Sequence, residues 1–179
     1  MSKRVITYVS SSQIPSNSAN SIQVLTQCLE LSKLGYKVHL YFSSNKKKQF
    51  LINSIQDKYG FNVSSLILHP SSTHFGLTNN FFIARDFFTD LFLRRDIGTI
   101  ITRNFYVSFI LRVFNIKHTF EVHHIEKNFV KKQIQLFAIS GSFTKVICIS
   151  NALLRNINQK IKKRKSINQQ IVLHDGSDL

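Results

Sequence analysis

Hydrophobic residues along this chain form short runs, separated by stretches in which they recur every three or four positions. The first run, residues 5–9, is rich in β-branched side chains and too short for a helix, so it predicts a buried strand. Residues 10–18 are polar and contain Pro15, which is typical of a loop. A helical spacing follows up to Leu34, and Gly35 stands where a left-handed helix end is expected.

This alternation continues to the end of the chain. Expected strands are 5–9, 38–42, 63–68, 98–102, 118–122, 145–149 and 171–173, and expected helices end at Leu34 or span 49–59, 81–96, 105–114, 127–140 and 151–161. The pattern predicts an α/β fold: a doubly wound, mostly parallel Rossmann-like sheet of about seven strands with helices on both faces. No repeat or linker interrupts it, so residues 1–179 are interpreted as one domain.

Two of the expected helices have a marked apolar face. The first, 81–96, would bury Phe81, Ala84, Phe87, Phe88, Leu91 and Phe92, and the second, 127–140, would bury Phe129, Ile134, Phe137 and Ala138. The first helix also fits a membrane-surface helix with a basic flank at Arg94 and Arg95, although its three aspartates argue against this. We expect Cys28 and Cys148 to be core residues, because their spacing fits no metal motif.

The net charge of +15, from 24 Lys and Arg against 9 Asp and Glu, suggests a nucleic acid, an anionic membrane or a phosphorylated substrate as partner. A solvated lysine-rich surface explains it equally well. The basic runs at 46–48 and 160–165 lack interleaved aromatics and an RNA-binding signature, which argues against nucleic acid. With no apolar run of membrane-spanning length and no signal peptide, we expect a cytoplasmic protein, with peripheral contact to the inner membrane face as an option.

Two common ligands of α/β folds are not supported. A nicotinamide site needs glycines in the first turn and an acidic residue after the second strand, and a P-loop needs GxxxxGK[ST]; the chain has neither pattern. Polar residues nevertheless follow the expected strands, and their carboxyl ends should face one crevice. These residues are Ser10, Ser11, Ser12, Asn17, Arg103, Asn104, His123, His124, Ser150, Asn151, His174 and Asp175. Such groups suit a polyol or a phosphate.

The ordered segments NSAN-x-IQ, LGY-x-VHL, ITRN, FEVHH, KVICISNALL and HDGSDL resemble the N-terminal half of family-four-type glycosyltransferases. The resemblance covers nearly the whole chain. It implies one half of a GT-B fold, retention of anomeric configuration, and no cofactor or required metal. The intact enzyme would move a sugar from a nucleotide-sugar donor to a glycan, lipid-linked or cell-envelope acceptor. A positive N-terminal domain would also suit an anionic lipid surface.

The resemblance assigns roles to three residues near the expected strand ends. His123 matches the histidine that faces the donor sugar and the acceptor, and it is the candidate catalytic residue; otherwise it would be a supporting histidine bonded to a backbone carbonyl. Glu121 matches the acid of the same motif and has a structural hydrogen bond as its alternative role. Arg103 matches a strand-end arginine that would contact an acceptor phosphate or pair with Glu121. His124 is expected at the surface.

In the first loop, Asn17, Ser18 and Asn20 match the segment that approaches the donor diphosphate, and helix capping is their alternative role. Asp175 and Gly176 match a structural turn before the interdomain link. The family binds its nucleotide through a C-terminal domain that would begin after Leu179, so we expect this half alone to turn over slowly or not at all. Two other interpretations stay open: a basic, non-catalytic nucleic-acid-binding or scaffold domain, and half of a GT-B sugar-nucleotide epimerase.

Overall fold

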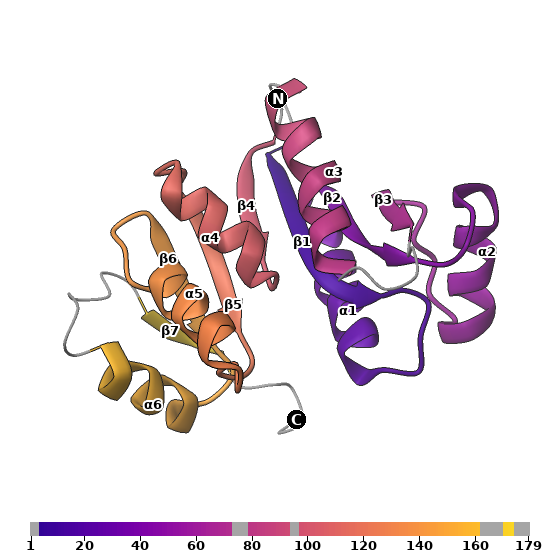
Figure 1. The fold of residues 1–179 in the computed structure, drawn as a ribbon. Coiled ribbons are helices and arrows are strands. Elements are labelled where there is room, and N and C mark those ends of the chain that lie inside the picture. Colours follow the sequence, from indigo (N-terminus) through magenta and orange to yellow (C-terminus); the bar gives the residue numbers. More distant parts are fainter. Residues whose placement is uncertain (1–3, 73–78, 94–96, 162–169, 174–179) are drawn as a thin grey trace. The chain divides into compact units, whose positions relative to one another are not determined.

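The structure is a computed structural model of the chain, and it describes residues 4–72, 79–93, 97–161 and 170–173. Within these residues, seven strands alternate with six helices, and the strands form one sheet in the order β3-β2-β1-β4-β5-β6-β7 (Figure 1). The strand pairs with a defined register are parallel, so the predicted α/β class with a doubly wound sheet is confirmed. The strands are β1 (Val5–Gln13), β2 (Lys37–Ser44), β3 (Leu66–Ser72), β4 (Thr99–Thr102), β5 (His118–Val122), β6 (Thr144–Cys148) and β7 (Gln170–Val172). The helices are α1 (Ala19–Lys33), α2 (Lys48–Tyr59), α3 (Asn79–Leu93), α4 (Phe105–Val113), α5 (Phe129–Ile139) and α6 (Asn151–Ile161).

The chain divides into two compact units, Met1–Ile100 and Ile101–Leu179, which are described in turn. The first unit holds β1 to β3 and α1 to α3. The second holds β5 to β7 and α4 to α6, and β4 spans the boundary in sequence.

Helices cover both faces of the strands in the first unit. The Tyr8 hydroxyl donates to Oε1 of Gln27 in α1 over 2.8 Å, and the Tyr41 hydroxyl donates to Oδ2 of Asp90 in α3 over 2.7 Å. Tyr41 stands opposite Val9, the neighbour of Tyr8 in β1. Because successive strand side chains point to opposite faces, α1 and α3 lie on opposite faces.

β1 runs further than the sequence predicts. The expected loop began at residue 10, but the strand continues to Gln13, and Ser10 and Ser12 are buried within it. The Ser10 hydroxyl donates to Ser12 Oγ over 2.9 Å, and the Ser12 amide donates to Ser10 Oγ over 3.1 Å. The two serines therefore satisfy each other inside the fold, which composition alone does not reveal.

β3 differs from its prediction in the same way. It was expected over 63–68 and followed by a loop, but the strand spans Leu66–Ser72 and includes His69 and Pro70. Proline cannot donate a ladder hydrogen bond, and it is tolerated here because β3 is an edge strand of the sheet. Because the strand extends past residue 68, His69 is a strand residue paired with Tyr41 of β2, which fixes the position of its side chain.

Two helix ends in the first unit follow the sequence prediction. Gly35 has a φ of 89° just after α1, and Gly60 has a φ of 71° at the C-cap of α2. Both conformations are left-handed, which glycine adopts without the steric cost of a Cβ. These turns return the chain from α1 to β2 and from α2 towards β3.

The buried face of α3 agrees with the predicted one only in part: Ala84 and Phe87 are buried as expected, but Phe81 and Phe92 are not. Ile83, Ala84 and Phe87 are buried, whereas Phe81 and Phe92 are 61% and 71% exposed. The helix packs across β1, β2 and β3, so its contact stripe is set by the strands below it rather than by the richest aromatic stripe. Arg94 and Arg95 lie outside the described residues. No described helix has the length and apolar character needed to cross a membrane.

The second unit has its own hydrophobic core between β5, β6 and the helices α4 to α6. Phe120, Val146, Ile139 and Ile157 belong to it, and so does Cys148, a free buried cysteine like Cys28 of the first unit. Burial raises the pKa of the Cys148 thiol to about 11. Of the predicted α5 core residues, Ala138 is buried, but Phe129 and Phe137 are 72% and 42% exposed, so the assignment of those two was wrong.

Candidate functional site

Three of the predicted site residues meet at the carboxyl ends of β4 and β5. Thr102 pairs with Phe120 in this parallel ladder, so the next positions, Arg103 and Glu121, stand side by side and point to the same face. His123 is two residues after Glu121 and returns to that face. The strand register therefore brings the guanidinium, the carboxylate and the imidazole together.

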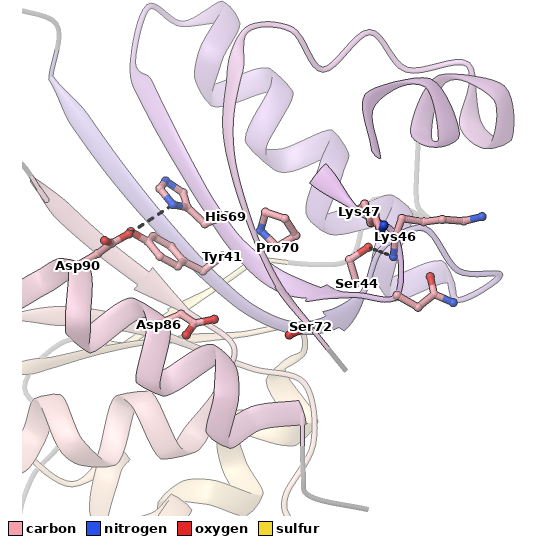
Figure 2. Close-up of a pocket in the computed structure, with 10 residues that line it drawn as sticks. Tyr41, Ser44, Lys46, Lys47, His69, Pro70, Ser72, Asp86 and Asp90 are labelled. Atoms are coloured by element: carbon pink, nitrogen blue, oxygen red, sulfur yellow. Dashed lines mark hydrogen bonds and ion pairs between the residues drawn. The ribbon is translucent and has the colours of Figure 1, made fainter. Parts of the chain in front are cut away.

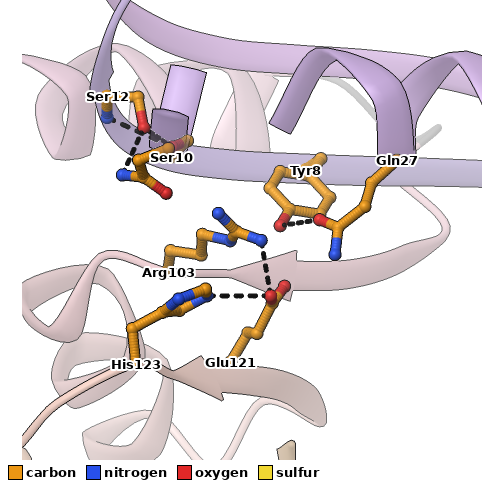
Figure 3. A network of polar contacts seen from close by, with 8 residues as sticks. Tyr8, Ser10, Ser12, Gln27, Arg103, Glu121 and His123 are labelled. Carbon is orange, nitrogen blue, oxygen red and sulfur yellow. Dashed lines mark hydrogen bonds and ion pairs between the residues drawn. The ribbon is translucent and has the colours of Figure 1, made fainter. Parts of the chain in front are cut away.

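Glu121 holds both partners through one carboxylate oxygen (Figure 3). Its Oε1 lies 2.5 Å from Arg103 Nη2 and 2.9 Å from His123 Nε2. A carboxylate oxygen only accepts, so Nε2 of His123 carries a proton and donates it. The side chains of Arg103 and Glu121 are 4% and 6% exposed, whereas that of His123 is 23% exposed. The imidazole is therefore the member of this trio that meets the surface.

The loops on either side of the trio are fixed by amide side chains. Asn104 follows Arg103 directly, and its Oδ1 accepts from the amides of Tyr106 and Val107 to cap α4. Beyond His123, the buried Gln135 of α5 donates from Nε2 to the carbonyl of His124 over 2.8 Å and accepts the Glu126 amide over 2.9 Å. These hydrogen bonds hold the chain segments that carry Arg103 and His123 in place.

The predicted donor-loop residues lie in the first unit and are described there by themselves. Asn17 is exposed, and Asn20 donates from Nδ2 to Ser12 Oγ over 2.8 Å. Ser18 occupies the N-cap position of α1, but its side chain makes no capping hydrogen bond. The Ser18 side chain therefore does not have the capping role that was its expected alternative, and the first amides of α1 have no side-chain cap from Ser18.

The other strand-end residues take structural or peripheral positions. His124 is 72% exposed and pairs with Glu126 at 3.5 Å, as expected for a surface residue. Ser150 Oγ accepts the Leu153 amide over 3.2 Å at the start of α6. His174, Asp175 and Gly176 lie outside the described residues, as do residues 162–165 of the second basic run.

A pocket in the first unit was not predicted from the sequence. Its volume is about 680 Å³, and it lies at the carboxyl ends of β2 and β3 beside α3 (Figure 2). Tyr41, His69, Asp86 and Asp90 are among its lining residues, together with Lys46 and Lys47. A strand assignment that included His69 would have pointed to it, because His69 and Tyr41 then become register partners on one face.

Comparison with known proteins gives no assignment. Neither models of protein families nor curated protein sequences match this chain. The function must therefore be argued from the fold and from the side chains that it brings together.

Proposed function

We propose that this chain is the acceptor-side, N-terminal domain of a retaining GT-B glycosyltransferase, which moves a sugar from a nucleotide-sugar donor to a glycan, lipid-linked or cell-envelope acceptor. The main observation behind this proposal is that one carboxylate oxygen of Glu121 accepts hydrogen bonds from both Arg103 and His123 at adjacent strand ends. The parallel α/β sheet and the ordered sequence segments support the same proposal.

In this role His123 is the group that contacts the sugar or the acceptor. Glu121 fixes its ring by accepting from Nε2, in the way a carboxylate orients the histidine of a hydrolytic triad. In the neutral imidazole the other nitrogen, Nδ1, is then an acceptor for a substrate hydroxyl. Arg103 is buried against Glu121 and acts as a positioning residue rather than as a ligand for an acceptor phosphate.

The resemblance assigns the donor diphosphate to the start of α1 in the first unit; within that unit the helix dipole favours negative charge there, and the Ser18 side chain makes no capping hydrogen bond. Asn17 and Ser18 are exposed there and can reach a ligand. Departure of the nucleoside diphosphate would be stabilised electrostatically. We place the reaction in the cytoplasm, and the net charge of +15 would favour contact with an anionic membrane face.

The proposal is tested by NMR on the isotope-labelled chain. UDP-, GDP- and TDP-linked hexoses and short oligosaccharides are titrated in, and the His123 imidazole resonances are followed. At least one sugar should shift them, and His123→Gln should weaken that binding. Sugar transfer is measured in parallel, with and without a supplied donor-binding domain.

His124→Gln is the matched control, because His124 is adjacent but mostly exposed and directed to Glu126. It should leave binding and transfer unchanged. If no sugar shifts the His123 resonances, or if both variants have equal effects, the glycosyltransferase proposal is wrong.

A further inference from the structure

The pocket of the first unit has one wall built around a carboxylate. Asp90 Oδ2 accepts the Tyr41 hydroxyl over 2.7 Å and lies 3.4 Å from Nδ1 of His69. The His69 ring stacks on Tyr41 with centroids 4.2 Å apart, and its Nε2 lies 3.1 Å from Nδ1 of the buried His39. Asp90 is therefore held in one position before any ligand arrives (Figure 2).

A second carboxylate borders the same space. Asp86 precedes Asp90 by four residues in α3, so both lie on one side of the helix, and both line the pocket. Carboxylates accept hydrogen bonds but donate none. This wall is therefore suited to the hydroxyl groups of a polyol or sugar.

The pocket also has a basic part, at the turn from β2 into α2. Lys46 and Lys47 line it, and within the described part of the chain neither ammonium forms an ion pair. Ser44 Oγ accepts the Lys46 amide over 3.2 Å, which fixes the turn. Lys47 is the N-cap of the twelve-residue helix α2; its carbonyl accepts the Phe50 amide over 3.0 Å, but its side chain caps none of the first amides. Positive charge and helix-start amides thus come together.

We propose that this pocket binds a phosphorylated sugar or polyol, with the phosphate at Lys46 and Lys47 and the hydroxyls at Asp86 and Asp90. A simple anion would meet the carboxylates, and a simple cation would meet the lysines, so the lining suits a ligand that carries hydroxyls at one end and a phosphate at the other. The volume of about 680 Å³ lies in the range of small-molecule sites. The proposal uses none of the residues assigned to sugar transfer and does not rest on that function.

In the experiment the full chain is titrated separately with glucose 6-phosphate, glucose and inorganic phosphate. Binding is measured by calorimetry and by the shifts of the amide resonances of β2, β3 and α3. Glucose 6-phosphate should bind more tightly than either part alone and shift resonances around Tyr41 and Asp90. The double variant Lys46→Gln/Lys47→Gln should weaken glucose 6-phosphate binding by about tenfold or more. Asp90→Asn should weaken the binding of both glucose 6-phosphate and glucose.

The matched control is Lys58→Gln/Lys145→Gln, which removes the same charge from two exposed lysines outside the pocket. If this control weakens binding as much as the pocket variant does, the attraction is only the net charge of the chain, and the assignment is overturned. Two further probes test other ligand classes: the free amino acid glycine, and vesicles made of phosphatidylglycerol. Pocket shifts with glycine alone, binding to vesicles alone, or no shifts with any probe would each overturn it.

Discussion

Nη2 of Arg103 lies 2.5 Å from Oε1 of Glu121, and both side chains are almost completely buried. Burying two charges is costly, so such a pair is held by its mutual attraction and by its other hydrogen bonds. Removal of either partner leaves a buried charge without its counterion. The pair therefore makes the candidate site a place where function and stability are coupled.

Arg103→Met should lower the free energy of unfolding by about 3–5 kcal/mol. The double variant Arg103→Met/Glu121→Gln should lose less than the sum of the two single losses, as measured by urea denaturation. Arg85→Met is the control, because the side chains of the Arg85–Asp86 pair are 56% and 33% exposed, and it should cost no more than about 1 kcal/mol. Strictly additive losses in the double variant would contradict a coupled buried pair.

Gly98→Ala should destabilise the first unit strongly. Gly98 has a φ of 60°, and a Cβ there would overlap the carbonyl oxygen of Val5. The backbone conformation and the clash together should cost about 2–4 kcal/mol in thermal or urea unfolding. Gly35→Ala is the matched control, since its φ of 89° is also positive but no atom lies within 4 Å of the added Cβ. It should cost only about 1 kcal/mol, and equal losses would exclude the Val5 contact as the cause.

His118 should make the protein less stable in acid. Burial lowers the pKa of His118 below its ordinary value of 6.5, and the charge of Arg112 acts in the same direction, against a hydrogen bond to the Ile116 carbonyl. The unfolded chain therefore takes up a proton first as the pH falls. The contribution of His118 to stability is complete above about pH 6.5 and is lost towards its lower folded-state pKa.

The measurement compares unfolding free energies at pH 7.5 and 5.5. His118→Asn should reduce the difference between them, although it also removes the 2.8 Å contact of Nε2 with Ser108 Oγ and so lowers stability at both pH values. His124→Gln, at an exposed position, should keep the difference of the parent chain. An unchanged pH dependence in His118→Asn would show that other groups govern acid stability.

Tyr41→Phe should loosen the acidic wall of the pocket. It removes the hydroxyl that donates to Asp90, a hydrogen bond to a charged group, and should cost about 1.5–3 kcal/mol of stability in urea unfolding. Tyr36→Phe should be nearly neutral, because the described residues offer its hydroxyl no hydrogen bond. If the two variants are equally stable, the Tyr41–Asp90 contact does not stabilise the native state.

The sequence predicts the order of elements well, because strand and helix periods differ and the glycine helix ends are local. It also places Arg103, Glu121 and His123 at strand ends, and the alternative role expected for Arg103, pairing with Glu121, is the one its side chain has. The prediction that Phe129 is buried was wrong, because burial depends on which neighbouring element a helix packs against. The extensions of β1 and β3 were missed because buried serines and Pro70 are acceptable only in their tertiary context.

Pro70 lies within the outermost strand of the sheet, β3. An incoming segment that tried to extend the sheet at this border would meet a ring where a backbone donor is needed. Growth by strand addition, the first step towards β-aggregates, is therefore disfavoured along β3. The same imino acid that interrupts the local strand pattern thus protects the chain from self-association at this edge.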